Sequence, residues 1–102
     1  MFANGMRLIY PGEILREEYL KPSGMSANAL AGALHLTAAR VNEIVREKRG
    51  ITPDTALRLS RYLGTTAEFW LNLQMMYELR KTIETEGKAI IDAIQPRDVE
   101  MG

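Results

Sequence analysis

Residues 26–48, SANALAGALHLTAARVNEIVREK, carry the pattern from which the fold of this chain can be predicted. Ser26 and Thr37 are residue types that cap helix N-termini, so two short helices should begin there, joined by a tight connection at residues 35–37. Each half carries apolar side chains at helical spacing: Leu30, Ala31 and Leu34 in the first, Val41, Ile44 and Val45 in the second. Small residues such as Ala31 and Ala33 allow two helices to cross closely. The stretch predicts a helix-turn-helix motif.

Three more helices are expected around this motif, and no strand is, because apolar and polar residues do not alternate. One helix begins after Pro11 and ends near residues 21–22. A fourth is capped by Thr52 and runs to Gly64, and a fifth opens at residues 65–66 and reaches about residue 80. The predicted fold class is all-α, with five helices and a short C-terminal helical extension.

The helix signals divide the chain into three parts. Residues 1–9 are an N-terminal extension, residues 10–80 form the helix-turn-helix domain, and residues 81–102 form a C-terminal extension. Residues 82–89 are polar, whereas Ile90, Ile91 and Ile94 favour one amphipathic helical turn before Pro96. The tail after that turn is expected to be frayed. A length of 102 residues suits one compact domain.

Composition argues against several functional classes. With 46% hydrophobic and 25% charged residues, the chain is close to the average for globular proteins. It has no cysteine and a single histidine, His35, so we expect no metal site and no cofactor. No apolar run is long enough to cross a membrane, which favours a cytoplasmic location. Neighbouring carboxylates such as Glu17 and Glu18 lack any histidine, serine elbow or glycine-rich loop beside them, so no catalytic residues are predicted.

Charge is distributed unevenly, although the formal net charge is zero. Residues 35–61 contain six basic and three acidic side chains, whereas residues 82–102 contain two basic and five acidic ones. A basic centre suits contact with phosphates, and an acidic end suits a basic partner or a position away from the phosphates. Ordinary scatter of surface charge is the alternative explanation.

The second helix of the motif is predicted to enter the DNA major groove with its N-terminal residues at base edges. The predicted base-contacting residues are Thr37, Ala38, Ala39, Arg40, Asn42 and Glu43. Alanine methyl groups suit thymine methyls, Arg40 suits guanine, and Asn42 suits adenine or a phosphate. Glu43 could accept from cytosine or restrain Arg40 or Arg46, and we favour restraint.

A second set of polar residues is expected to contact the DNA backbone. The predicted phosphate-contacting residues are Ser26, Asn28, Arg46, Lys48 and Arg49. The basic ones could alternatively be a solvated helix end that favours the helix dipole. Arg58 and Arg61, on the following helix, are second-rank candidates.

The fifth helix carries more apolar surface than one stripe can bury, so part of it should face a second subunit. The predicted dimer-interface residues are Trp70, Leu73, Met76 and Tyr77, although core packing is the favoured role for Trp70 over ligand stacking. A homodimer would place two recognition helices about 34 Å apart on one face of double-stranded DNA. The operator should therefore be an inverted repeat.

Five segments carry a family resemblance: residues 11–20 (PGEILREEYL), 30–31 (LA), 49–53 (RGITP), 56–59 (ALRL) and 69–74 (FWLNLQ). Together they resemble the HigA antitoxin family of Xre-type helix-turn-helix regulators, over about residues 10–80. The resemblance implies a lambda-repressor-like fold and a repressor that binds an operator in its own promoter. In toxin-linked members it also implies binding of a small RelE-like, mRNA-cleaving toxin.

Two positions depart from the family pattern. Ala27 stands where members often have a glutamine that supports DNA contact, and His35 stands where they often have a glycine in the turn. Two alternatives to an autoregulating antitoxin follow. One is a protein-interaction module that neutralises a toxin through its acidic tail or fifth helix and binds DNA weakly. The other is a stand-alone Xre-type regulator that has no toxin.

Overall fold

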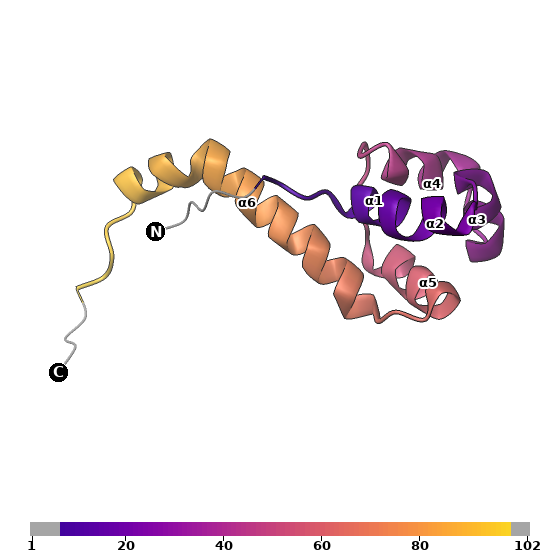
Figure 1. Cartoon of the computed structure of the whole chain (residues 1–102). Helices are drawn as coiled ribbons and strands as arrows, with labels where there is room; N and C mark the ends of the chain where they lie inside the picture. Colours follow the sequence, from indigo (N-terminus) through magenta and orange to yellow (C-terminus); the bar gives the residue numbers. More distant parts are fainter. Residues whose placement is uncertain (1–6, 99–102) are drawn as a thin grey trace.

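The computed structural model describes residues 7–98, and all regular structure in this range is helical (Figure 1). The elements are α1 (Pro11–Ile14), η1 (Leu15–Leu20), α2 (Lys21–Ser23), α3 (Ala27–Leu34), α4 (Ala38–Val45), α5 (Pro53–Leu63) and α6 (Ala67–Ala93). Because α1, η1 and α2 follow one another without a break, they form one helix. The described range therefore contains the five helices predicted. The expectations for residues 1–6 and 99–102 lie outside it.

The first helix begins at Pro11 and ends at Ser23, within one residue of the predicted bounds. Its middle, η1, is π-helical, and the N–H of Lys21 bonds the carbonyl of Arg16, five residues back. A proline ring clashes with the carbonyl four residues back in a regular α-helix, and the wider π turn just before Pro22 relieves that clash. The C-cap residue is Gly24, whose φ of 69° is a left-handed value.

The core lies where the first helix, α3, α4, α5 and the start of α6 meet. Its buried apolar residues are Leu15, Leu20, Leu30, Ala31, Leu34, Val41, Ile44, Ile51, Ala56, Leu59 and Trp70. Trp70 is fully buried, and its indole N–H donates to Thr65 Oγ1 at 2.7 Å. The structure thus corrects the placement of Trp70 in a dimer interface, because a side chain with no exposed surface cannot contact a second subunit. Its favoured role in core packing is confirmed.

Gly12 explains why the first helix can cross α4 so closely. A Cβ atom built on Gly12 would overlap the backbone carbonyl oxygen of Ile44. The approach of two backbones leaves no space for a side chain, so only glycine fits here. The crossing sets the position of α4 relative to the rest of the bundle.

The last helix, α6, is longer than the sequence signals indicate. It spans 27 residues and continues through residues 82–89, where a break had been expected. Lysine, glutamate and alanine are good helix formers, and ion pairs one turn apart, such as Lys88–Asp92 at 2.9 Å, support the helix on its exposed surface. The predicted boundary between residues 80 and 81 falls inside this helix and remains a prediction.

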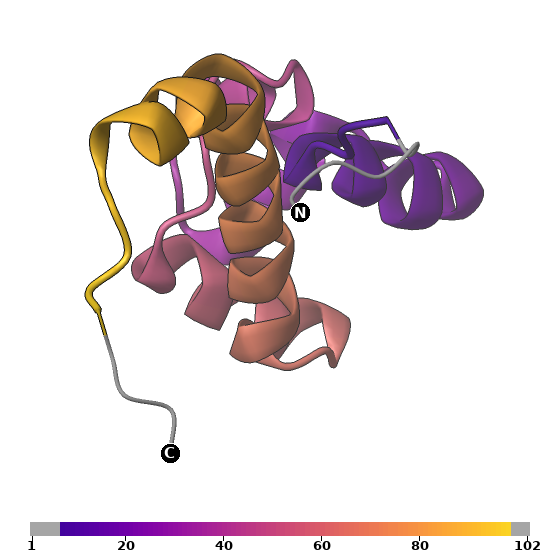
Figure 2. The ribbon, with the colours of Figure 1, turned by 90° about the vertical axis from the view of Figure 1, so that its left-hand side faces the viewer.

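The long α6 gives the molecule an elongated shape. The extents are 55 × 25 × 22 Å, and the radius of gyration is 17.4 Å, against about 13 Å for a compact chain of this length. Its C-terminal part leaves the bundle and bends away from the direction of its first part (Figures 1 and 2). No helix within residues 7–98 combines the length and the apolar character that a membrane crossing requires.

Candidate nucleic-acid interface

The two helices of the motif begin at the predicted caps. Ser26 Oγ accepts the N–H of Ala29 at 3.0 Å, and Thr37 Oγ1 accepts the N–H of Arg40 at 3.1 Å. Each hydroxyl satisfies a backbone donor that the first turn of a helix leaves unpaired. Both cap predictions are confirmed, and they define where α3 and α4 start.

His35 forms the turn between α3 and α4. Its φ of 57° is left-handed, and the N–H of Leu36 bonds the carbonyl of Ala31 at 3.0 Å. This is the pattern that glycine most often supplies at the end of a helix. His35 therefore meets the geometric requirement of the turn, at the energetic cost of placing a Cβ atom in the left-handed region.

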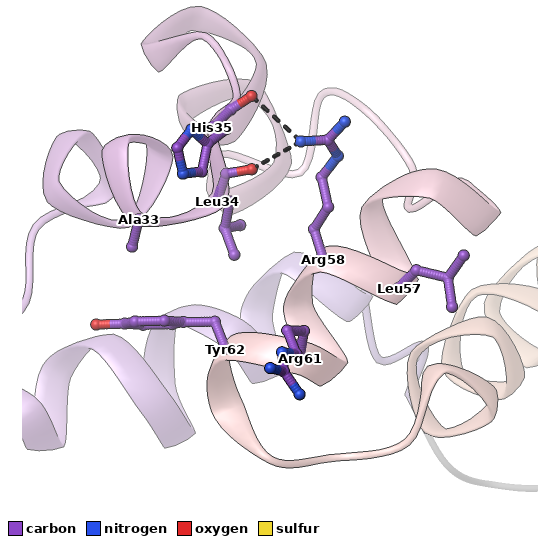
Figure 3. A pocket seen from close by; sticks show the side chains of 7 residues that line it. All are labelled: Ala33, Leu34, His35, Leu57, Arg58, Arg61 and Tyr62. Carbon is purple, nitrogen blue, oxygen red and sulfur yellow. Dashed lines mark hydrogen bonds between the residues drawn. The ribbon is translucent and has the colours of Figure 1, made fainter.

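Arg58 of α5 holds this turn from the other side (Figure 3). Its Nη1 donates to the carbonyl oxygens of Leu34 at 2.9 Å and His35 at 3.3 Å. The contact lies beside an open pocket of about 490 Å³, lined in part by Leu57 and Tyr62. Arg58, predicted as a second-rank DNA contact, is thus engaged in an intramolecular role.

The N-terminal face of α4 is open to solvent. Thr37, Ala38 and Ala39 are exposed, and the Arg40 side chain is 38% exposed. Arg40 forms an ion pair with Asp54 of α5, with 3.6 Å between Nη1 and Oδ2. The same carboxylate oxygen accepts from Arg58 Nε at 3.0 Å. Sequence spacing gave no sign of Asp54 in this position.

Asn42 and Asn28 are joined across the motif. Asn42 Nδ2 donates to Asn28 Oδ1 and to the carbonyl of Ala38, both at 2.8 Å. The two amide hydrogens of Asn42 are thus engaged, whereas bidentate contact with adenine needs that NH₂ group as a donor. Asn42, a predicted base contact, and Asn28, a predicted phosphate contact, are therefore hydrogen-bonded to each other in this structure.

Glu43 restrains an arginine side chain, which is the role we favoured for it, but the arginine is Arg49. Its Oε1 accepts from Arg49 Nε at 2.8 Å, whereas Arg40 or Arg46 had been expected. The reason is that α4 ends at Val45, so the chain turns back and brings residue 49 to the face that carries Glu43. Both side chains of this pair are 46% exposed.

The end of α4 is held by Arg16 of the first helix. Arg16 Nη1 donates to the carbonyl of Val45, and Nη2 lies 3.2 Å from Glu47 Oε2. Hydrogen bonds to Glu17 and then to Glu47 raise the pKa of the Arg16 guanidinium above its ordinary value, against a lowering by burial. Arg16 thus supports the turn at residues 46–49, in which Arg46 and Lys48 are exposed.

Gln74 of α6 holds the next stretch of backbone. Its Oε1 accepts the N–H of Ile51 at 2.8 Å. Its side-chain amide lies against Gly50, and a Cβ atom built on Gly50 would come within 2.7 Å of Gln74 Nε2. The loop that carries Lys48 and Arg49 is therefore fixed at both ends, by Arg16 and by Gln74. The roles of Asp54, Arg16 and Gln74 are not apparent in the sequence, because their partners are distant in the chain.

A second surface lies between residues 7–9 and α6. It is a groove of about 190 Å³, whose lining includes Leu73, Met76 and Tyr77 from the predicted dimer interface. The ring of Tyr77 packs against that of Tyr10 in a tilted arrangement, with 4.3 Å between ring centroids, and Met76 is 63% exposed. Among the four predicted interface residues, Met76 therefore offers the most open apolar side chain.

Comparison with known proteins places the chain in a family. The model of the helix-turn-helix family (HTH_3) matches residues 17–70. Virulence-associated protein I of Dichelobacter nodosus is 59% identical over 93 residues, 91% of this chain and 84% of that protein. Two solved structures are each 50% identical in sequence to this chain. They are the Pseudomonas aeruginosa antitoxin HigA with the higBA promoter, with a TM-score of 0.88, and the antitoxin GraA in complex with its operator, with a TM-score of 0.89.

The coverage of these similarities is nearly complete. The HigA structure covers 89% of this chain and 99% of its own, and the GraA structure covers 97% and 100%. The family model spans the capped motif and the buried Trp70, so it matches the elements that build the site. The chain therefore belongs to the Xre-type helix-turn-helix regulators of the HigA antitoxin family.

Proposed function

We propose that this chain is a sequence-specific repressor that binds an inverted repeat in its own promoter as a homodimer and serves as the antitoxin of a HigB/HigA-type pair. The observation that carries the proposal is the N-terminal face of α4, which is exposed, capped and held in place by Arg16, Arg58 and Gln74. A preorganised helix of this kind fits the major groove. Two relatives of 50% identity are described with promoter or operator DNA.

The proposed base-contacting face consists of Thr37, Ala38, Ala39 and Arg40, together with Asn42, whose amide must leave Asn28 to contact a base. The proposed phosphate contacts are Ser26, Asn28, Arg46, Lys48 and Arg49. Arg46 and Lys48 are exposed at the end of α4, where they can approach the DNA backbone. Glu43 contributes by restraining Arg49 rather than by contacting a base.

The proposed dimer uses the groove of residues 7–9 and α6, through Leu73, Met76 and Tyr77. The apolar exposure of Met76 supports this assignment. A twofold axis there would pair two motifs on one inverted-repeat operator. We place the protein in the cytoplasm, where promoter DNA is accessible, and assign it no catalytic activity.

The decisive experiment measures binding of the purified protein to its own promoter fragment and to random DNA of equal length at two salt concentrations. Fluorescence anisotropy should show binding to the promoter at least about a thousandfold tighter, and weaker binding at higher salt. Equal affinity for both DNAs would contradict a sequence-specific repressor.

Neutralisation of a toxin is a second candidate function. Ile90, Ile91 and Ile94 in and after the last turns of α6 are 45%, 52% and 64% exposed, and they lie within the acidic segment of residues 82–102. An apolar patch beside acidic residues suits a small basic toxin of the RelE type. Co-expression with the product of the neighbouring gene tests this: a stable complex that blocks mRNA cleavage supports it, and the absence of a complex contradicts it.

A further inference from the structure

The side chain of Asp54 lies at the edge of the proposed DNA-binding face, beside Arg40. It sits in the first turn of α5, after the N-cap Thr52 and Pro53 at the first helical position. Its side chain is 57% exposed. A carboxylate this close to a surface that should meet phosphates is electrostatically unfavourable for DNA binding in general, so its position calls for a physical reason.

A chain of contacts fixes the Asp54 carboxylate in space. The chain starts at Arg58, whose Nη1 donates to the carbonyls of Leu34 and His35 in the turn of the motif (Figure 3). Its Nε then donates to Asp54 Oδ2 at 3.0 Å, one helical turn away on α5. Asp54 is therefore held by an arginine that is itself attached to the helix-turn-helix backbone.

The last contact in the chain reaches the recognition helix. Asp54 Oδ2 lies 3.6 Å from Arg40 Nη1. A guanidinium carries five N–H donors in a rigid planar fork, so an ion pair through Nη1 leaves donors on Nη2 and Nε. The remaining donors are those that a guanine needs, since its O6 and N7 accept a bidentate pair.

We propose that Asp54 is a positioning residue that holds Arg40 in the orientation needed for base contact and thereby contributes to operator specificity. The inference rests on the proposed function. Without Asp54, Arg40 is free to bind phosphates of any sequence, and one negative charge that disfavours random DNA is gone. The expected consequence is weaker operator binding together with unchanged or tighter binding to random DNA.

The test compares the full chain with its Asp54→Asn variant by fluorescence anisotropy on the promoter fragment and on random DNA. The ratio of the two affinities should fall about two- to fivefold, the range expected for an exposed ion pair. Glu68→Gln is the matched control, because it removes an acidic charge from the first turn of α6, and it should leave the ratio unchanged. Circular dichroism checks that each variant is folded, and Asp54→Ser provides a second uncharged variant.

A double-mutant cycle separates positioning from a general charge effect. In an Arg40→Ala background, Asp54→Asn should no longer change the ratio. On operators with single base-pair changes, Asp54→Asn should relax discrimination at the same base pair as Arg40→Ala. An equal change on operator and random DNA, or an effect that persists without Arg40, would overturn the proposal. If the unaltered protein itself shows no preference for its promoter, the proposed function fails as well, so the two failures are distinguishable.

Discussion

Gly12 shows how a single missing side chain determines the packing of the recognition helix. A Gly12→Ala change should lower the free energy of unfolding by about 1–3 kcal/mol, because its Cβ would overlap the carbonyl oxygen of Ile44 and backbone would have to move. Urea denaturation followed by circular dichroism measures the change.

Gly32 provides a matched control in the middle of α3. A Cβ atom there would meet nothing within 4 Å, and its φ is not left-handed. Gly32→Ala should therefore raise the free energy of unfolding by about 0.5–1 kcal/mol, since alanine loses less backbone entropy in a helix. Two alanine variants of similar effect would contradict the account of Gly12.

His35 is a second position where conformation matters more than contact. With φ at 57°, a His35→Gly change should raise the free energy of unfolding by about 1 kcal/mol. Because Arg58 binds the backbone carbonyl of residue 35 and not its side chain, that support should survive. Thermal denaturation tests the gain, and a lower melting temperature would show that the imidazole makes a stabilising contact.

Residues whose effect is local could be predicted from the sequence, and residues with distant partners could not. Ser26 and Thr37 cap helices through bonds to a backbone N–H three residues on, so their roles follow from residue type and position. The partner of Asp54 on α4 is separated from it by 14 positions, and Gln74 binds a backbone group 23 positions earlier. Only the folded chain brings these groups together.

At the scale of the element, α4 is expected to separate base contact from phosphate contact along its length. Arg40→Ala, near its N-terminus, should cost about 1–3 kcal/mol of operator binding and relax specificity. Lys48→Ala, just past its end, should weaken binding to all sequences alike and reduce the salt slope by about one unit. Anisotropy titrations over a series of salt concentrations measure both quantities, and equal losses for Arg40→Ala on operator and random DNA would refute its role in base contact.

The spacing of apolar residues did not predict the full length of α6. Residues 82–89 carry few apolar side chains, so no amphipathic stripe marks them. They remain helical because the helix is already nucleated before them, so each further residue that is fixed gains one backbone hydrogen bond, whereas nucleation fixes three residues for one bond. The apolar stripe predicted where α6 packs on the core, and the helix ends at Ala93, shortly before Pro96, which cannot continue it.

At the scale of the whole molecule, the elongated shape leaves a large part of α6 without a partner in its own chain. Its exposed apolar residues include Met75, Met76 and Leu79, which are 61%, 63% and 58% exposed. Single exposed apolar side chains are common on protein surfaces, whereas a group of them on one helix indicates an interaction surface. Association of two copies would cover part of this surface and place both recognition helices on one operator.

Met76→Lys tests that association directly. The new ammonium group would lie in the apolar groove with residues 7–9, one helical turn from Arg80, so dimer formation should be lost. Sedimentation velocity should then show a monomer, and affinity for the full inverted repeat should fall by about a hundredfold or more, because two linked half-site contacts become independent. Met75→Lys is the matched control: it introduces the same charge at an equally exposed neighbour outside the groove, and the dimer should survive. A Met76→Lys protein that remains dimeric would place the interface elsewhere on the molecule, whereas a Met75→Lys protein that dissociates would extend it around α6.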